Sequence, residues 1–183
     1  MRRLLTLLAL AVALAGCGTE ESAPPRTLPR AALPDLPSQT RALDADALAA
    51  DALQPGALER LLDQAGYVTG TEREFAGKTR TFDHVVARTL VFGTPGGAES
   101  YLGWLRGHGA DFLGRAQAAD VSVPGTSAVT FALAQCGSCK KEVPTFLAGW
   151  RRGEHVVTLL AGGSGANPER FAALARELDQ TVG

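Results

Sequence analysis

Residues 143–160, VPTFLAGWRRGEHVVTLL, decide how this chain folds. Two runs with apolar, β-branched and aromatic residues, 143–151 and 155–160, flank a three-residue loop with Gly at its centre, a pattern that is typical of a β-hairpin. Strands joined by so short a loop pair in an antiparallel manner. The stretch therefore predicts an antiparallel sheet that contains this hairpin.

More strands are predicted upstream of the hairpin. Residues 81–92 (TFDHVVARTLVF) and, less regularly, residues 67–75 carry similar β-branched and aromatic residues, and a turn at Gly77 joins them. Residues 128–133 (AVTFAL) predict one more strand. Together with the hairpin, these segments make a sheet of about five strands.

Apolar residues at three- and four-residue spacing predict helices around these strands. The predicted helices begin near Leu43, at Pro55, after Thr94 and after Asn167. Gly107 and Gly109 predict a kink or a division in the third helix, because Gly costs up to about 1 kcal/mol relative to Ala within a helix. The order of elements predicts one α+β domain at residues 43–183, with an antiparallel sheet packed against helices.

The N-terminus carries a targeting signal. Two arginines precede an apolar run at residues 4–15, which is the order of regions in a signal peptide, and the run is short for a membrane span. The run ends in LAGC, residues 14–17, which resembles the bacterial lipobox. That resemblance implies removal of residues 1–16 and a diacylglyceryl group on Cys17. Two acyl chains anchor a protein stably, so we expect attachment to the extracytoplasmic face of the cell membrane.

Residues 17–42 are expected to form the lipidated cysteine and a disordered tether. The segment from Gly18 to Arg41 holds five of the 10 prolines and has little apolar periodicity. Such a composition buries too little apolar surface to offset the entropy of the chain. The alternative interpretation is a proline-rich ligand for a recognition groove.

Composition and charge exclude several classes of protein. With 45 % hydrophobic and 20 % charged residues, the chain as a whole is neither disordered, collagen-like nor a coiled coil. The net charge is -1, and -3 once the two arginines of the signal peptide are removed. A nucleic-acid partner is therefore not expected.

Cys136-Gly137-Ser138-Cys139 is the motif with the clearest chemistry, and it has two interpretations. In an oxidising compartment the two cysteines are expected to form a disulfide. In the first interpretation the motif lies at a turn between antiparallel strands, where the bridge contributes about 2 kcal/mol to stability. Pro144, which has no backbone N–H, then lies at a strand edge, where no N–H is needed to pair with a neighbouring strand.

The second interpretation of the motif is redox chemistry. AVTFALAQCGSCKKEVPTFL, residues 128–147, resembles the active-site stretch of membrane-anchored thioredoxin-like oxidoreductases. The resemblance implies a helix over residues 140–148, with Cys136 at its start as the attacking thiolate and Cys139 as the resolving thiol.

No metal or cofactor is expected. The CxxC spacing occurs once, and His84, His108 and His155 lie on three separate predicted elements, so a zinc ligand set is incomplete. Trp104 and Trp150 are interpreted as core residues.

A wider resemblance covers residues 43–183. AGYVTGTEREFAG (65–77), VVARTLVFGTPGGAESYL (85–102) and FLAGWRRGEHVVTLLAGG (146–163), with the lipobox and the tether, resemble small actinobacterial secreted lipoproteins. Such domains are similar to the extracellular sensor domain of some mycobacterial Ser/Thr kinases and to PsbP-like sandwiches. The resemblance implies a sheet between helices and a cleft for a ligand or lipid, and it implies no reaction.

The leading hypothesis is a non-enzymatic sensing or ligand-binding lipoprotein, with a small ligand or an envelope protein as partner. The alternative is a thiol-disulfide oxidoreductase that uses Cys136 and Cys139. A binding domain is expected to have a mostly apolar pocket with a few converging polar groups between sheet and helices. A purely structural component of the envelope is expected to have a filled core instead.

Overall fold

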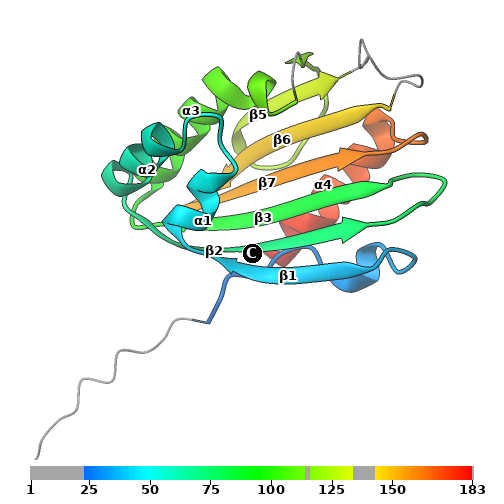
Figure 1. Ribbon diagram of the computed structural model, residues 1–183, viewed down its shortest axis with the longest axis horizontal. Coiled ribbons are helices and arrows are strands. Elements are labelled where there is room, and N and C mark those ends of the chain that lie inside the picture. The colour runs from blue at the N-terminus through cyan, green and yellow to red at the C-terminus, as the bar shows by residue number, and fades with distance from the viewer. Residues whose placement is uncertain (1–22, 114–115, 134–142, 183) are drawn as a thin grey trace, which may run out of the picture.

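The structure is a computed structural model that describes residues 23–113, 116–133 and 143–182. The elements, in chain order, are η1 (Arg30–Ala32), β1 (Ser38–Leu43), α1 (Ala45–Ala50), α2 (Pro55–Gln64), β2 (Tyr67–Ala76), β3 (His84–Phe92), α3 (Pro95–Phe112), β4 (Gln117–Ala118), β5 (Thr126–Leu133), β6 (Thr145–Arg152), β7 (His155–Gly162) and α4 (Pro168–Thr181). All seven strands lie in one antiparallel sheet in the order β1-β2-β3-β7-β6-β5-β4 (Figure 1).

The predicted hairpin is the β6–β7 pair, and β7 lies at the centre of the sheet. Arg152 pairs with His155 across the loop, where Gly153 has a positive φ of 60°. Most residues of both strands are buried, because helices cover both faces of the sheet. The α+β class and the antiparallel sheet are therefore confirmed, although the sheet has seven strands and not about five.

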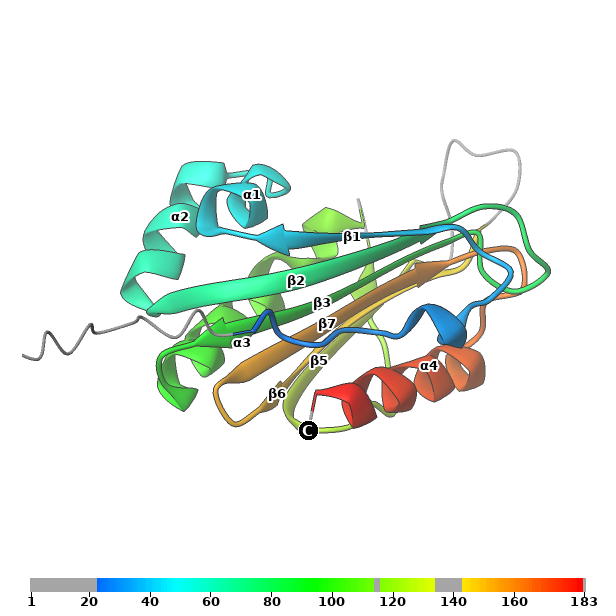
Figure 2. The same cartoon turned by 90° about the horizontal axis from the view of Figure 1, so that it is seen from below.

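Two layers of helix enclose two separate apolar clusters. On one face, α1, α2 and α3 pack on the sheet, and this cluster includes Leu58, Leu62 and Leu102. On the other face, α4 packs through Phe171, Leu174 and Leu178, which recur at helical spacing. Figure 2 shows α4 on the opposite side of the sheet from α1 and α2. The sheet is thus the middle layer of three.

The N-terminal segment packs against the sheet on the α4 side (Figure 2). Leu28 is fully buried, Leu36 is 3 % exposed, and the Thr27 hydroxyl donates to the Ala87 carbonyl at 3.1 Å. Residues 38–43 then form β1, the strand at one edge. The described residues 23–42 thus differ from the expected disordered tether. The burial of Leu28 and Leu36 on the core offsets the entropy lost when this segment is ordered.

The helix α3 is continuous through both of its C-terminal glycines, so the expected division into two helices is wrong. A Cβ on Gly109 would lie 2.3 Å from the Phe131 ring. Gly109 therefore lets α3 approach β5 closely, and the packing offsets the conformational cost of glycine.

Within the described residues, no helix is both long enough and apolar enough to cross a membrane.

Candidate functional site

A row of residues crosses the sheet on the face that α1 and α3 cover. Arg41 of β1 pairs with Glu72 of β2, which pairs with Arg88 of β3, and the row continues into Thr158 of β7 and Gly149 of β6. Because facing residues of paired strands point to the same side, this register places a cation, an anion and a cation next to each other. The charged row is fixed by the backbone pairing of three strands.

Glu72 joins the two arginines. Arg41 Nε donates to its Oε1 and Arg88 Nε donates to its Oε2, both at 2.6 Å. The Glu72 side chain is only 5 % exposed. Burial acts to raise the pKa of Glu72, but the hydrogen bonds and charges of Arg41 and Arg88 outweigh burial and hold the pKa below its ordinary value. Glu72 is therefore a buried carboxylate that stays ionised.

Asp51, which follows the last turn of α1, is the fourth charged group. Its Oδ2 accepts a hydrogen bond from Arg88 Nη2 and lies 3.4 Å from Arg41 Nη2. The Asp51 side chain is 38 % exposed, much more than that of Glu72. The four groups form a network with two positive and two negative charges.

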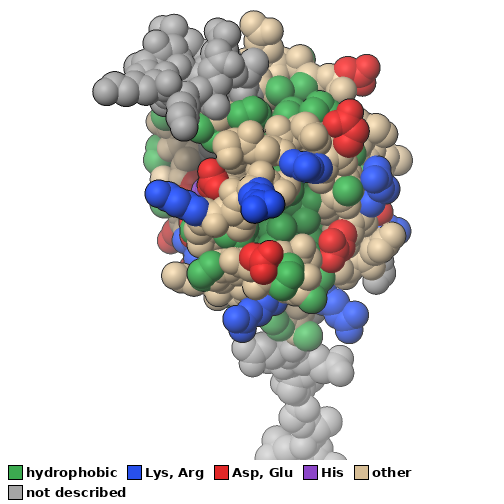
Figure 3. Space-filling model, turned by 90° about the vertical axis from the view of Figure 1, so that its right-hand side faces the viewer, with side chains coloured by type: hydrophobic (Ala, Val, Ile, Leu, Met, Phe, Trp, Pro, Cys, Tyr) green, Lys and Arg blue, Asp and Glu red, His purple; other side chains and the backbone are tan. Residues whose placement is uncertain are grey.

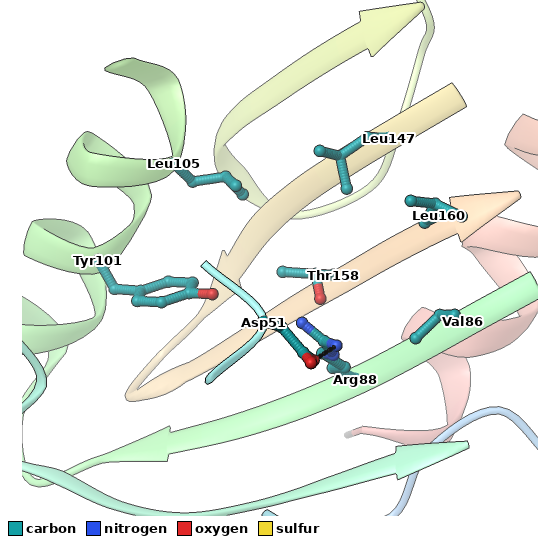
Figure 4. A pocket seen from close by; sticks show the side chains of 8 residues that line it. All are labelled: Asp51, Val86, Arg88, Tyr101, Leu105, Leu147, Thr158 and Leu160. Atoms are coloured by element: carbon teal, nitrogen blue, oxygen red, sulfur yellow. Dashed lines mark hydrogen bonds and ion pairs between the residues drawn. The ribbon is translucent and has the colours of Figure 1, made fainter. Parts of the chain in front are cut away.

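A cavity of about 130 Å³ lies beside this network, between α3 and the strands β3, β7 and β6 (Figure 4). Its polar lining consists of Asp51, Arg88, Tyr101 and Thr158, and its apolar lining of Val86, Leu105, Leu147 and Leu160. A Cβ on Gly149 would lie 2.5 Å from Leu105, so α3 packs directly on β6 at that point. The next residue of the row, Thr158, is also small, and the space above it remains open.

Tyr101 points its hydroxyl into the cavity (Figure 4). The residue as a whole is only 3 % exposed. The rings of Phe92 and Trp104 hold the tyrosine ring at centroid distances of 5.7 and 5.8 Å. Burial raises the pKa of Tyr101 to about 12, and the charge of Arg88 opposes that rise. Near neutral pH the phenol is therefore protonated and can donate a hydrogen bond.

The histidines lie outside the cavity lining. His84 Nε2 lies 2.9 Å from Glu74 Oε1 in an exposed pair, and the His108 ring stacks on Trp104 at 4.9 Å. His155 begins β7. Among the residues described here, no group of three or more His, Cys, Asp and Glu side chains could hold a metal ion.

Charges of both signs also occur at the end of the sheet where β2 connects to β3. Figure 3 shows acidic, basic and hydrophobic side chains interspersed over this end, without a continuous patch of one sign. The row Arg41, Glu72 and Arg88 on the sheet face under α1, where charges of opposite sign alternate, thus differs from this end of the molecule, where charges are mixed without order.

The cysteines singled out from the sequence, Cys17, Cys136 and Cys139, lie outside the described residues. The segment that follows the CxxC motif is described from Val143, and Thr145–Arg152 is the strand β6, which pairs with β7. The redox interpretation requires a helix through residue 148, whereas the turn interpretation requires an extended chain. The described residues 145–148 are extended, as the turn interpretation requires.

The charged row and Tyr101 were not found from the sequence. The sequence did contain a signal for Glu72 and Arg88, because each places a charge within a predicted strand. A charged side chain that is buried in a strand needs a partner of opposite charge. Tyr101 recurs at helical spacing with the apolar residues after Thr94, a pattern that indicates packing and gives no sign of a site. Trp150 was expected in the core and is fully buried, with Nε1 donating to Asp179 at 2.9 Å.

Comparison with known proteins gives a likeness in fold. No protein-family model and no curated protein matches this sequence. The structure is similar to the extracellular domain of PknH from Mycobacterium tuberculosis, with a TM-score of 0.53 and 15 % sequence identity over 84 % of this chain and 88 % of that one. At this identity the likeness shows the fold alone. The fold agrees with the resemblance to the extracellular domains of mycobacterial kinases.

Proposed function

We propose that this protein is a lipid-anchored, extracytoplasmic protein whose folded part binds a small ligand without chemical turnover. The observation that supports binding is the cavity beside Arg88, into which Tyr101 points its hydroxyl. A mostly apolar cavity with a few converging polar groups is the usual form of a small-molecule site.

The size of the cavity limits the ligand. Its volume of about 130 Å³ is close to that of engineered protein cavities of about 150 Å³ that bind benzene. It is smaller than the roughly 300–1,000 Å³ of sites for drug-sized molecules. The part of the ligand that enters the cavity therefore has about six non-hydrogen atoms.

The cellular location is proposed from the N-terminal sequence. The lipobox-like residues 14–17 support a lipid on Cys17, and the likeness in fold to an extracellular domain agrees with a location outside the cytoplasm. The membrane is then a partner through the acyl chains.

Methyl NMR with benzene as the probe tests whether the cavity binds small molecules, using the full chain with Cys17→Ser. Val86 and Leu160 line the cavity, whereas their chain neighbours Val85 and Leu159 belong to the opposite apolar cluster. We expect benzene to shift the methyl signals of Val86 and Leu160 and to leave those of Val85 and Leu159 in place. The filling variant Leu160→Phe is expected to remove the effect.

The absence of any shift at the cavity methyl groups, at benzene concentrations near its solubility, would overturn the proposed binding function. Equal shifts on both faces of the sheet would also overturn it, because they would show general partitioning into the core.

A further inference from the structure

We propose that the ligand of this cavity is a small organic monocarboxylate and that its carboxylate replaces Asp51 on Arg88. The inference rests on the proposed binding function and names the chemical class of the ligand.

The first argument is charge balance. Arg41, Glu72 and Arg88 lie on three paired strands and together carry a net charge of +1. Asp51 brings the network to neutrality, but it belongs to the segment between α1 and α2 and not to the sheet. The sheet therefore presents a site for one negative charge, which Asp51 fills from a neighbouring element.

The second argument is that Asp51 can be replaced at low cost. Its side chain is 38 % exposed, against 5 % for Glu72, so water solvates Asp51 readily when it leaves Arg88. Glu72 stays on Arg88 Nε in either case and keeps the guanidinium in place. Because Glu72 fixes the plane of the guanidinium, the remaining N–H groups of Arg88 are oriented to donate to a second carboxylate.

The third argument is the position of the polar groups around the cavity. Figure 4 shows the Asp51 carboxylate on Arg88 at the side of the cavity that Tyr101 and Thr158 also face. A ligand carboxylate at this place would accept hydrogen bonds from Arg88 and from the two hydroxyl groups. Charge-assisted hydrogen bonds of this kind are about twice as strong as those between neutral groups.

The apolar lining selects the rest of the ligand. Val86, Leu105, Leu147 and Leu160 surround the space away from Arg88, and they suit a hydrocarbon body of about six non-hydrogen atoms. The phenyl ring of benzoate has that size, and benzoate carries a single negative charge. A dianion would leave a surplus of negative charge beside Glu72.

Replacement of Asp51 also gives the ligand a way to act on the protein. Arg88 and Arg41 hold the end of α1 through Asp51. A ligand that takes this place releases the segment from Asp51 to Gln54, which connects α1 with α2. Binding at the sheet is thereby coupled to the position of the two outer helices.

Isothermal titration calorimetry tests the inference with benzoate and its neutral isostere benzamide, on the full chain with Cys17→Ser. We expect benzoate to bind at least about tenfold more tightly than benzamide, because only benzoate balances the charge of Arg88. Asp51→Asn is expected to tighten benzoate binding about tenfold, since it removes the competing carboxylate. Asp46→Asn is the matched control, because Asp46 is an exposed acid of the adjacent helix α1 and lies outside the network.

The sign of the Asp51→Asn effect separates this inference from a structural role, because a residue that only supports the site would weaken binding when changed. Equal binding of benzoate and benzamide, or equal tightening by Asp46→Asn, overturns the monocarboxylate inference. Benzoate that binds without shifting the methyl groups of Val86 and Leu160 overturns it as well. If benzene binds in the cavity and benzoate does not, the binding function stands and the monocarboxylate inference fails.

Discussion

Glu72 joins two arginines of neighbouring strands, and its ionisation therefore contributes to the free energy of unfolding. We expect Glu72→Gln to lower that free energy by about 2 kcal/mol at pH 7, because Arg41 and Arg88 lose a charged acceptor. The pKa of Glu72 is lower in the folded protein than its ordinary value of 4.5, so its contribution is present above that value. It is lost as the pH falls through the folded pKa.

Urea denaturation of both proteins between pH 3 and pH 7 measures this contribution. The two free energies of unfolding are expected to approach each other as the pH falls through the folded pKa of Glu72. Glu74→Gln is the control, because Glu74 lies on the same strand and is 47 % exposed, and we expect a change below about 0.5 kcal/mol. A Glu72→Gln deficit that stays constant with pH would contradict the argument.

Tyr101 is a buried phenol and Tyr67 a partly buried one. The Tyr67 hydroxyl donates to the Leu43 carbonyl at 2.8 Å, whereas the Tyr101 hydroxyl faces the cavity. We expect Tyr67→Phe to lower the free energy of unfolding by about 1 kcal/mol and Tyr101→Phe not to lower it. Thermal denaturation without ligand measures both, and equal destabilisation by the two changes would show that Tyr101 has a partner within the fold.

At the scale of elements, the N-terminal segment is part of the core of the protein. Leu28 is fully buried on the α4 face, and we expect Leu28→Ala to lower the free energy of unfolding by about 3 kcal/mol. Leu53→Ala is the control, since Leu53 is 76 % exposed and should change stability by less than about 0.5 kcal/mol. Chemical denaturation measures both free energies of unfolding. A Leu28→Ala protein as stable as the unchanged protein would support the interpretation of this segment as a disordered tether.

The CxxC motif lies between β5 and β6, which pair with each other. We expect the Cys136→Ser/Cys139→Ser double variant to lose about 2 kcal/mol of stability, because a short disulfide loop removes little entropy from the unfolded chain. The intact protein is expected not to reduce insulin with a dithiol as electron donor. Insulin reduction that Cys136→Ser abolishes would instead establish the redox interpretation.

Sequence patterns predicted the helices and strands that bury at least one face in the core. They did not predict the strands β1 and β4, which are mostly exposed. The hairpin and the closing helix were expected, since both carry apolar residues at the spacing of their structure. β1 has four exposed residues in succession at the edge of the sheet, so it shows no alternation, and β4 has only two residues. The charged row was beyond prediction because it depends on the register between strands that are 16 to 31 residues apart.

At the scale of the whole molecule, the proposed lipid anchor predicts where the protein is found. We expect the natural protein in the membrane fraction and the Cys17→Ser protein in the soluble fraction, because anchoring depends on the two acyl chains. Fractionation after a high-salt wash measures the distribution. A Cys17→Ser protein that remains in the washed membranes would contradict the lipid anchor.

The strand order also has a consequence for when the chain can fold. β3 is complete at residue 92, but its other neighbour, β7, begins at residue 155, so the centre of the sheet requires residues that are far apart in the chain. Such non-local pairing makes folding slow, on the order of milliseconds to seconds. The N-terminal half cannot complete the sheet during synthesis, because β7 is among the last elements made. Until β7 has been made, β3 therefore lacks the neighbour that connects the two halves of the sheet.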